Sequence, residues 1–256
     1  MGDQGKKGRA RVVTREDYSP QGFRWLRLKR LSYVDRRGNK RNWESAERST
    51  RPPSGIDAVA VYARLVSKGS KGGEQVVLVS QFRPPLDCNV LELPAGLVDS
   101  GETPAEAALR ELREETGLVG KATRESPVVF SDPGMSSANM KLVEVVVDMD
   151  DTRNQVPTQE LDEGEDIKVH YVSADKLGQE LQSLSESEDL AIDARLYAVA
   201  FGQDLNRPPP SSSRGWMSKK MDFSFSVDPQ MVLFTSAVFL STAVLARLTK
   251  HLFLSK

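Results

Sequence analysis

Three glutamates at helical spacing, Glu111, Glu114 and Glu115, are the residues of this chain best suited to chemistry. On a helix, side chains three and four positions apart lie on one side, so these carboxylates would project toward a common point. Like charges placed this way repel one another. Arg110, four residues before Glu114, can hold one of them, which leaves Glu111 and Glu115 free for a metal ion. Several hard oxygen ligands suit Mg2+ or Mn2+, which also bind substrate phosphates.

The helix that must carry these glutamates has clear start and stop signals. Thr103 is a good N-cap, Pro104 suits the first helical position, and Glu106 completes a capping box. Gly117 stands where a left-handed C-terminal cap is favoured. The sequence therefore predicts a helix from Pro104 to about Thr116.

The wider segment matches a complete motif, G-x5-E-x7-R-E-U-x-E-E-x-G-U, in which U is an apolar residue. An acidic helix face alone is usually solvated surface, but here every fixed position of the motif is filled. Because of this match, the chain resembles the Nudix hydrolases, and the resemblance implies metal-dependent cleavage of phosphate anhydrides. The matched positions are Gly96, Glu102, Arg110, Glu111, Leu112, Glu114, Glu115, Gly117 and Leu118.

The flanking segments are similar to one branch of that family, the ADP-sugar pyrophosphatases. They are SQFRPP at 80–85, SDPG at 131–134 and WES at 43–45, and the likeness covers about residues 23–203. It implies hydrolysis of ADP-ribose to AMP and ribose 5-phosphate, with two or three Mg2+ ions as cofactors. It also implies a homodimer in which an N-terminal hairpin is swapped between the subunits.

The resemblance assigns the substrate contacts. Trp25 and Trp43 match two tryptophans that stack on adenine, and an indole face gains about 1 to 3 kcal/mol per stacked base. Packing in the core or in the dimer interface is the alternative for both side chains. Arg48 and Arg83 match contacts to the ribose and the diphosphate, for which the guanidinium fork is well shaped.

The resemblance also assigns the catalytic centre. The backbone carbonyl of Ala95 joins Glu111 and Glu115 as metal ligands, with Glu114 beside them, and Leu97 borders the substrate.

A loop after the box would supply the base. Glu165 matches the glutamate that acts on the attacking water, with Glu163 as the reserve candidate, and Asp132 matches a residue near the terminal ribose.

Two other functions remain open at this stage. Another nucleoside diphosphate sugar or an oxidised nucleotide would use the same metal site with a different base pocket. A non-catalytic nucleotide-binding module is the second, although such a module normally lacks one of the box glutamates, and none is missing here.

Composition narrows the partners. The chain has 256 residues and a net charge of -1, which gives no general attraction to nucleic acid, so we expect no nucleic-acid partner. Its single cysteine, Cys88, excludes an intramolecular disulfide and a cysteine-based zinc cluster.

The pattern of apolar residues predicts a mixed α/β domain of sandwich type, and the resemblance implies the Nudix α/β/α sandwich with a mixed sheet. A disordered start (1–22) precedes an N-terminal hairpin (23–55) for dimerisation and base binding, which turns at residues 37–39. The Nudix hydrolase domain (56–203) follows. Its strands are expected in 57–66, 75–82, 90–99, 126–149 and 167–173, and its helices in 104–116, 174–182 and 191–201.

The remaining residues predict a linker at 204–229 and an apolar tail helix at 230–256. Met231 to Ala246 is free of charge and slightly shorter than the roughly 20 residues that cross a bilayer. We expect a membrane anchor that leaves the catalytic domain in the cytosol, with the mitochondrial outer membrane favoured. A helix docked on the enzyme's own surface is the alternative.

Overall fold

The computed structural model describes residues 10–69 and 73–205. Within them, no helix has the length and apolar composition needed to span a bilayer. The membrane-anchor helix expected at 230–256, and all but the first two residues of the linker before it, lie outside the described residues.

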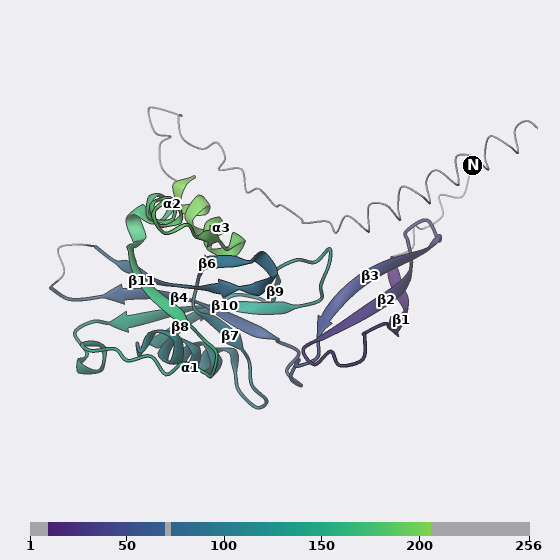
Figure 1. Cartoon of the computed structure of the whole chain (residues 1–256), viewed down its shortest axis with the longest axis horizontal. Coiled ribbons are helices and arrows are strands. Elements are labelled where there is room, and N and C mark those ends of the chain that lie inside the picture. Colours follow the sequence, from purple (N-terminus) through teal and green to yellow (C-terminus); the bar gives the residue numbers. More distant parts are fainter. Residues whose placement is uncertain (1–9, 70–72, 206–256) are drawn as a thin grey trace, which may run out of the picture. The chain divides into compact units, whose positions relative to one another are not determined.

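A mixed sheet forms the centre of the catalytic domain (Figure 1). Its main strand order is β12-β6-β5-β4-β10-β8, while β11 adds to β5, β7 to β4 and β9 to β10. The β4–β10 and β6–β12 pairs are parallel and the others are antiparallel. The strands are β4 (Ala58–Val66), β5 (Gln75–Arg83), β6 (Cys88–Glu92), β7 (Ala95–Leu97), β8 (Lys121–Glu125), β9 (Val129–Phe130), β10 (Asn139–Asp148), β11 (Ile167–Ser173) and β12 (Ala191–Ile192).

Helices cover both faces of this sheet because successive strand residues point to opposite sides. Val59 and Val61 of β4 join the core cluster under α1 (Pro104–Thr116), whereas Ala58 and Ala60 face α2 (Leu177–Glu188) and α3 (Ala194–Asp204). The expected α/β/α sandwich is confirmed. Three short 3-10 turns complete the elements, at Pro84–Leu86, Thr152–Asn154 and Ala174–Lys176.

A separate three-stranded antiparallel sheet precedes the domain. It consists of β1 (Arg11–Asp17), β2 (Leu26–Val34) and β3 (Lys40–Arg48). The predicted hairpin is β2 and β3. Its turn forms because the Asp35 carboxylate accepts the N–H groups of Arg37 and Asn39, and Gly38 adopts a φ of 85°.

Two sequence predictions are corrected here. Disorder over residues 1–22 is wrong for the part that is described, since residues 11–17 form β1 along β2. β-branched Val12, Val13 and Thr14 favour an extended chain, but only the neighbouring strand makes it regular. The helices expected at 174–182 and 191–201 have other limits. The first is a 3-10 turn followed by α2, which extends to Glu188, where Asp189 ends it in the left-handed conformation. The second begins only at Ala194, because residues 191–192 pair with β6 as β12.

Candidate active site

Helix α1 is the platform of the site and has the predicted limits. The Thr103 hydroxyl accepts the N–H of Glu106 while the Glu106 carboxylate accepts the N–H of Thr103, which is a complete capping box. At the other end, Gly117 has a φ of 73°, and its N–H donates to the carbonyl of Arg113. Local signals therefore fix where the three glutamates stand.

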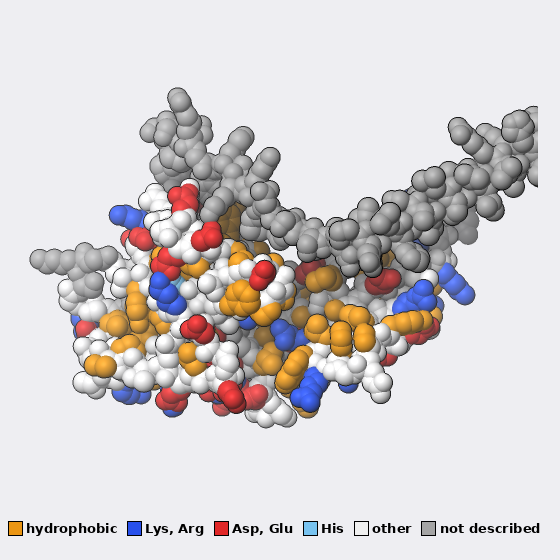
Figure 2. All heavy atoms as spheres, in the orientation of Figure 1, with side chains coloured by type: hydrophobic (Ala, Val, Ile, Leu, Met, Phe, Trp, Pro, Cys, Tyr) orange, Lys and Arg blue, Asp and Glu red, His pale blue; other side chains and the backbone are white. Residues whose placement is uncertain are grey.

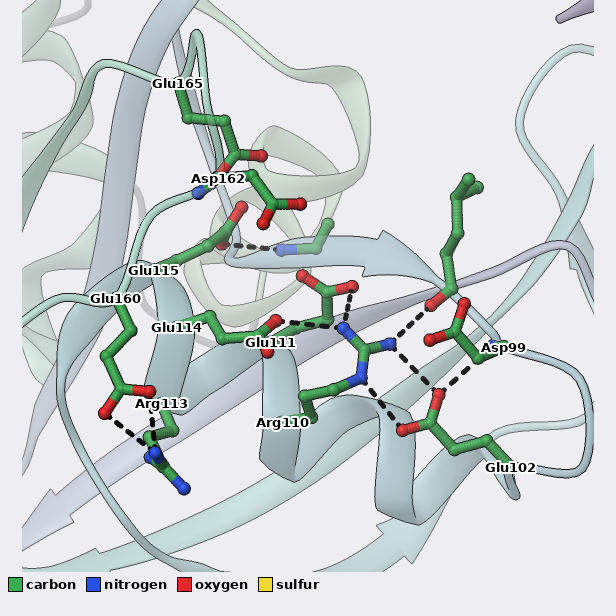
Figure 3. Close-up of polar contacts among 12 residues, drawn as sticks. Asp99, Glu102, Arg110, Glu111, Arg113, Glu114, Glu115, Glu160, Asp162 and Glu165 are labelled. Carbon is green, nitrogen blue, oxygen red and sulfur yellow. Dashed lines mark hydrogen bonds and ion pairs between the residues drawn. The ribbon is translucent and has the colours of Figure 1, made fainter.

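Arg110 is the centre of a charged network between this helix and the loop before it (Figure 3). Its Nε and Nη2 bond the two carboxylate oxygens of Glu102, both at 3.0 Å, and Nη2 also donates to the carbonyl of Leu97 at 2.9 Å. Its Nη1 lies 2.8 Å from Glu111 Oε1 and 2.9 Å from Glu114 Oε2. Hydrogen bonding to Glu102 is the main reason that the pKa of Arg110 is raised.

The structure corrects the prediction that Arg110 pairs with one glutamate and leaves Glu111 unpaired. Arg110 holds Glu114 as predicted, but it also holds Glu111, which is therefore not free. Burial nevertheless raises the pKa of Glu111, and the charges of Glu114 and Glu165 act in the same direction, against the stabilising effect of Arg110. Adjacent helical residues do not normally face each other, so the contact between Arg110 and Glu111 could not be read from their spacing.

Glu115 is the most deeply buried acid of the site, with 3 % of its surface exposed. Burial raises the pKa of its carboxyl to about 8, and the nearby charges of Glu111 and Glu165 add to this effect. The N–H of Ala95, 3.0 Å from Glu115 Oε2, and the charge of Arg83 only partly offset it.

Strand β7 brings the backbone of the box against these carboxylates. Gly96 pairs with Val59 of β4, so the N–H and C=O of the preceding residue, Ala95, point away from β4, on the side of Glu115. A Cβ on Gly96 would overlap the carboxylate of Glu111, so only glycine permits this close approach. The expected carbonyl ligand thus faces the expected carboxylate ligand.

The loop between β10 and β11 closes over the end of α1. The side-chain amide of Gln159 donates to the carbonyls of Glu115 and Ile167, and the N–H of Glu160 donates to the carbonyl of Glu114. Sequence reasoning missed Gln159, because the fold alone brings these two carbonyls together.

The tip of the same loop carries the expected base. Glu165 accepts the N–H of Asp162 through Oε2, and the turn between them uses Gly164 with a φ of 90°. The negative charge of Glu165 is one of the causes that raise the pKa of Glu111 and of Glu115. Figure 3 shows Glu165 and Asp162 on this loop. Glu165 stays the candidate base, with Glu163 in reserve.

Arg83 lies near this centre but is already paired. Its Nε is 3.0 Å and its Nη2 is 2.5 Å from Oε2 of Glu92, a buried acid on β6. Sequence reasoning missed Glu92, because only the pairing of β5 with β6 brings it within reach of Arg83.

The expected substrate contacts on the hairpin are exposed. Trp25 and Trp43 have 66 % and 50 % of their surfaces accessible, so packing in the core of this chain is excluded for both. Figure 2 shows hydrophobic side chains exposed over the strands of the hairpin sheet. The Trp43 indole N–H donates to the carbonyl of Gly134 at 2.8 Å. Both residues line a pocket of about 530 Å³. Arg48 ends β3 and is exposed. Asp132 begins the loop that holds Gly134, and its carbonyl accepts the N–H groups of Met135 and Ser136.

The residues present fit a divalent cation. Glu111 and Glu115 are four residues apart on α1, burial raises the pKa of both carboxyls, and a cation would stabilise their charged forms. In the described part of the chain, no three His, Cys, Asp or Glu side chains already converge at metal-binding geometry. The pairing of Glu111 and Glu114 with Arg110 holds both carboxylates in a salt bridge.

Comparisons with known proteins agree with this site. A family model described as "NUDIX domain" matches residues 57–193. A Nudix hydrolase of Schizosaccharomyces pombe is 42 % identical over 192 residues, covering 75 % of this chain and 92 % of the relative. The "ADP-ribose pyrophosphatase" of Saccharomyces cerevisiae is 39 % identical, covering 78 % and 86 %, and the "ADP-sugar pyrophosphatase" of Mus musculus is 37 % identical, covering 74 % and 86 %.

A solved structure described as an ADP compounds hydrolase matches with a TM-score of 0.53 and 17 % identity. The match covers 78 % of this chain and 96 % of that one. At this identity it supports the fold alone.

Proposed function

The chain belongs to the NUDIX family, and from that premise we propose that it is an ADP-sugar pyrophosphatase that hydrolyses ADP-ribose to AMP and ribose 5-phosphate. The yeast and mouse relatives, named for ADP-ribose and ADP-sugars, support this substrate class. The single observation that carries the proposal is that α1 sets the buried Glu115 against the N–H of Ala95 in β7, with the carboxylate of Glu111 beside Gly96. Hydrolysis adds water across the diphosphate, and attack at either phosphorus gives these two products.

We propose a divalent metal, Mg2+ with Mn2+ as a substitute, as the cofactor. Glu111, Glu115 and the carbonyl of Ala95 would hold it, with Glu114 joining if it leaves Arg110. When bound, such an ion neutralises charge on the diphosphate and makes water more acidic. Arg110 keeps the box loop and α1 together throughout, because it bonds Glu102 and Leu97 as well as the helix.

The side chains of this chain supply the remaining steps. Glu165 accepts a proton from the attacking water. Arg83, near Glu115, places positive charge at the non-bridging oxygens once it exchanges Glu92 for phosphate. Leu97, Arg48 and Asp132 would line the ribose portions of the substrate.

A substrate panel tests the function. Purified protein is incubated with Mg2+ and ADP-ribose, other nucleoside diphosphate sugars or an oxidised nucleotide, and initial rates and products are measured. ADP-ribose should have the highest kcat/KM and give AMP in equal amount to ribose 5-phosphate. A higher kcat/KM for another substrate would reassign the base pocket, and no turnover of any would contradict the proposal.

The positions of the two tryptophans support a homodimer. Trp25 lies opposite Ser49 at one end of the hairpin, and Trp43 lies six residues from Ser49 along β3. At about 3.4 Å per residue the Cα positions of the two tryptophans are about 20 Å apart along the hairpin, so we infer that the two indoles of one chain do not enclose the same adenine. A shared base site therefore needs one tryptophan from each of two copies.

A mixed dimer tests this arrangement. Trp25→Ala and Trp43→Ala should each raise KM for ADP-ribose about 10-fold, the size of a lost stack, with less effect on kcat. Co-expression with two different tags isolates a dimer that contains one chain of each variant. Because the lesions then fall in the same site, the other site is intact, and the mixed dimer should recover the parental KM with about half the parental kcat.

If both sites of the mixed dimer keep the raised KM, then both tryptophans of one chain serve the same site, or neither of them binds the base. A monomeric protein with parental kinetics would contradict the dimer itself.

We also propose that residues 206–256, outside the described residues, anchor the enzyme to a cytosol-facing membrane, the mitochondrial outer membrane being favoured. The apolar run from Met231 to Ala246 and the basic residues after it support this.

A truncation after Leu205 tests the anchor. It should keep full activity and appear in the soluble fraction, because α3 ends at Asp204 and the bond from Gln203 to Tyr62 is retained. The full-length protein should pellet with membranes and resist a carbonate wash. Extraction of the full-length protein by carbonate, or unfolding of the truncated one, would count against an anchor.

A further inference from the structure

One buried acid of the catalytic domain has no part in the proposed hydrolysis. The side chain of Asp57, just before β4, is 0 % exposed. Its Oδ1 accepts Arg51 Nε at 2.8 Å, and its Oδ2 accepts Arg51 Nη2 at 2.7 Å and the N–H of Asn139 at 2.9 Å. A buried carboxylate is rarely kept unless it is fully paired, so this pair needs a reason.

The Asp57 end of the pair is joined to the metal-site strand. The carbonyl of Asp57 accepts the N–H of Val98, the residue directly after β7, at 3.1 Å. Its N–H donates to the side-chain carbonyl of Asn139, whose amide donates in turn to the carbonyl of Gly55. Asp57 is thus held from three sides in the part of the domain that carries Ala95 and Gly96.

The Arg51 end is joined to the hairpin. Arg51 follows β3 by three residues, and β3 carries Trp43 and Arg48. Its Nη2 also donates to the carbonyl of Ser137 at 2.6 Å.

The loop that contains Ser137 runs along the edge of β3. The N–H of Ser137 donates to the carbonyl of Ala46, the N–H of Ala46 donates to the carbonyl of Met135, and the Trp43 indole donates to Gly134. Over the described residues, the bridge between Ala46 and Ser136 is the backbone pairing that links the hairpin sheet to the domain. The loop and the ion pair together connect the two parts.

We infer that the Arg51–Asp57 ion pair is a positioning device for the substrate: it sets the hairpin, with Trp43 and Arg48, at a fixed distance from β7 and the metal-binding glutamates. The inference rests on the proposed function, in which adenine lies on the hairpin and the diphosphate lies at the box. A rigid link matters because a displacement of about 1 Å between such subsites costs a large factor in rate or affinity. Neither side chain touches substrate.

The test variant removes both charges together. Arg51→Met alone would leave Asp57 buried without its cation, so the double variant Arg51→Met with Asp57→Asn is used, in which the amide oxygen can still accept the N–H of Asn139. We expect KM for ADP-ribose to rise about 10-fold and kcat to change less than about twofold.

Arg64→Met is the matched control. Arg64 is 31 % exposed, against 33 % for Arg51, and pairs with Glu74 and Glu144 at the far end of β4. It should keep the parental KM even if it lowers the melting temperature by a similar amount.

A double-mutant cycle with Trp43→Ala separates positioning from plain stabilisation. If the ion pair acts through the hairpin, then removing the ion pair from a protein that already carries Trp43→Ala should raise KM much less than 10-fold above that of Trp43→Ala alone. Two outcomes would overturn the inference while leaving the proposed function in place. One is a double variant with a lower melting temperature and an unchanged KM. The other is a combined variant in which the KM increases of the ion-pair loss and of Trp43→Ala multiply in full. A parent protein that neither hydrolyses ADP-ribose nor shows tryptophan quenching by AMP would overturn both.

Discussion

Glu115→Gln is expected to lower the turnover number for ADP-ribose by about 100-fold or more without loss of the fold, and Glu111→Gln should do the same. Each change removes a charged oxygen ligand from the ion that stabilises the transition state. Glutamine keeps the shape of the side chain, and at position 115 its carbonyl can still accept the N–H of Ala95. Initial rates at saturating ADP-ribose and Mg2+, with circular dichroism of each variant, provide the measurement.

The loop glutamates supply the controls for this series. Glu165→Gln should also lower kcat, since Glu165 is the candidate base for the attacking water. Glu163→Gln, the same change two residues away, should leave kcat close to the parental value. A larger loss in Glu163→Gln would move the base to that residue, and near-parental turnover of Glu115→Gln would refute the metal assignment.

The same substitution should stabilise the metal-free protein at alkaline pH. The pKa of Glu115 is raised from 4.5 to about 8 in the folded chain, so the folded state binds more protons than the unfolded state between these values. The carboxyl group of Glu115 therefore makes its full contribution to the stability of the folded state below about pH 4.5. This contribution is lost as pH rises toward 8. We expect Glu115→Gln, which has no charge to bury, to gain on the order of 2 to 4 kcal/mol at pH 8.

Thermal melting in EDTA measures this effect. Glu115→Gln should melt about 5 to 10 °C above the parent at pH 8, and the two should melt together near pH 4.5. Mg2+ at pH 8 should then raise the melting temperature of the parent more than that of the variant, because binding to the native state stabilises it. Glu106→Gln, an exposed acid of the same helix, should lose stability rather than gain it, since its capping box weakens. Equal melting temperatures of the parent and Glu115→Gln at pH 8 in EDTA would contradict the claim that the buried charge of Glu115 destabilises the metal-free protein.

Local signals in the sequence were sufficient for the elements of the site. The limits of α1 follow from Thr103, Glu106 and Gly117, all of which act within one turn of the helix. The hairpin of β2 and β3 follows from alternating residues around a turn at Gly38. The spacing of the glutamates, together with the surrounding motif, pointed to the family that residues 57–193 match.

Interactions between distant segments were not predictable in the same way. Residues 11–17 become a strand only because β2 lies beside them. Arg83 meets Glu92 because β5 and β6 pair in one register, and Arg110 meets Glu111 because the box loop holds the guanidinium above the helix. The spacing of these residues along the chain is silent about such contacts, since the partners are set by strand pairing and by a folded loop.

The sequence by itself determined which acids this protein has, where its helix begins and ends, and the kind of ion that such oxygens bind. Only the tertiary structure decided that Glu115 is buried against Ala95 and that Arg110 also holds Glu111, because burial and neighbouring charges depend on how the sheet, helix and loop pack. It also decided that Trp25 lies at the open end of the hairpin and Trp43 near its middle, and that Arg51 is joined to Asp57, whose carbonyl bonds the residue after β7. The distances between the proposed base, diphosphate and metal subsites depend on how distant segments pack together. They cannot be read from the order of residues alone.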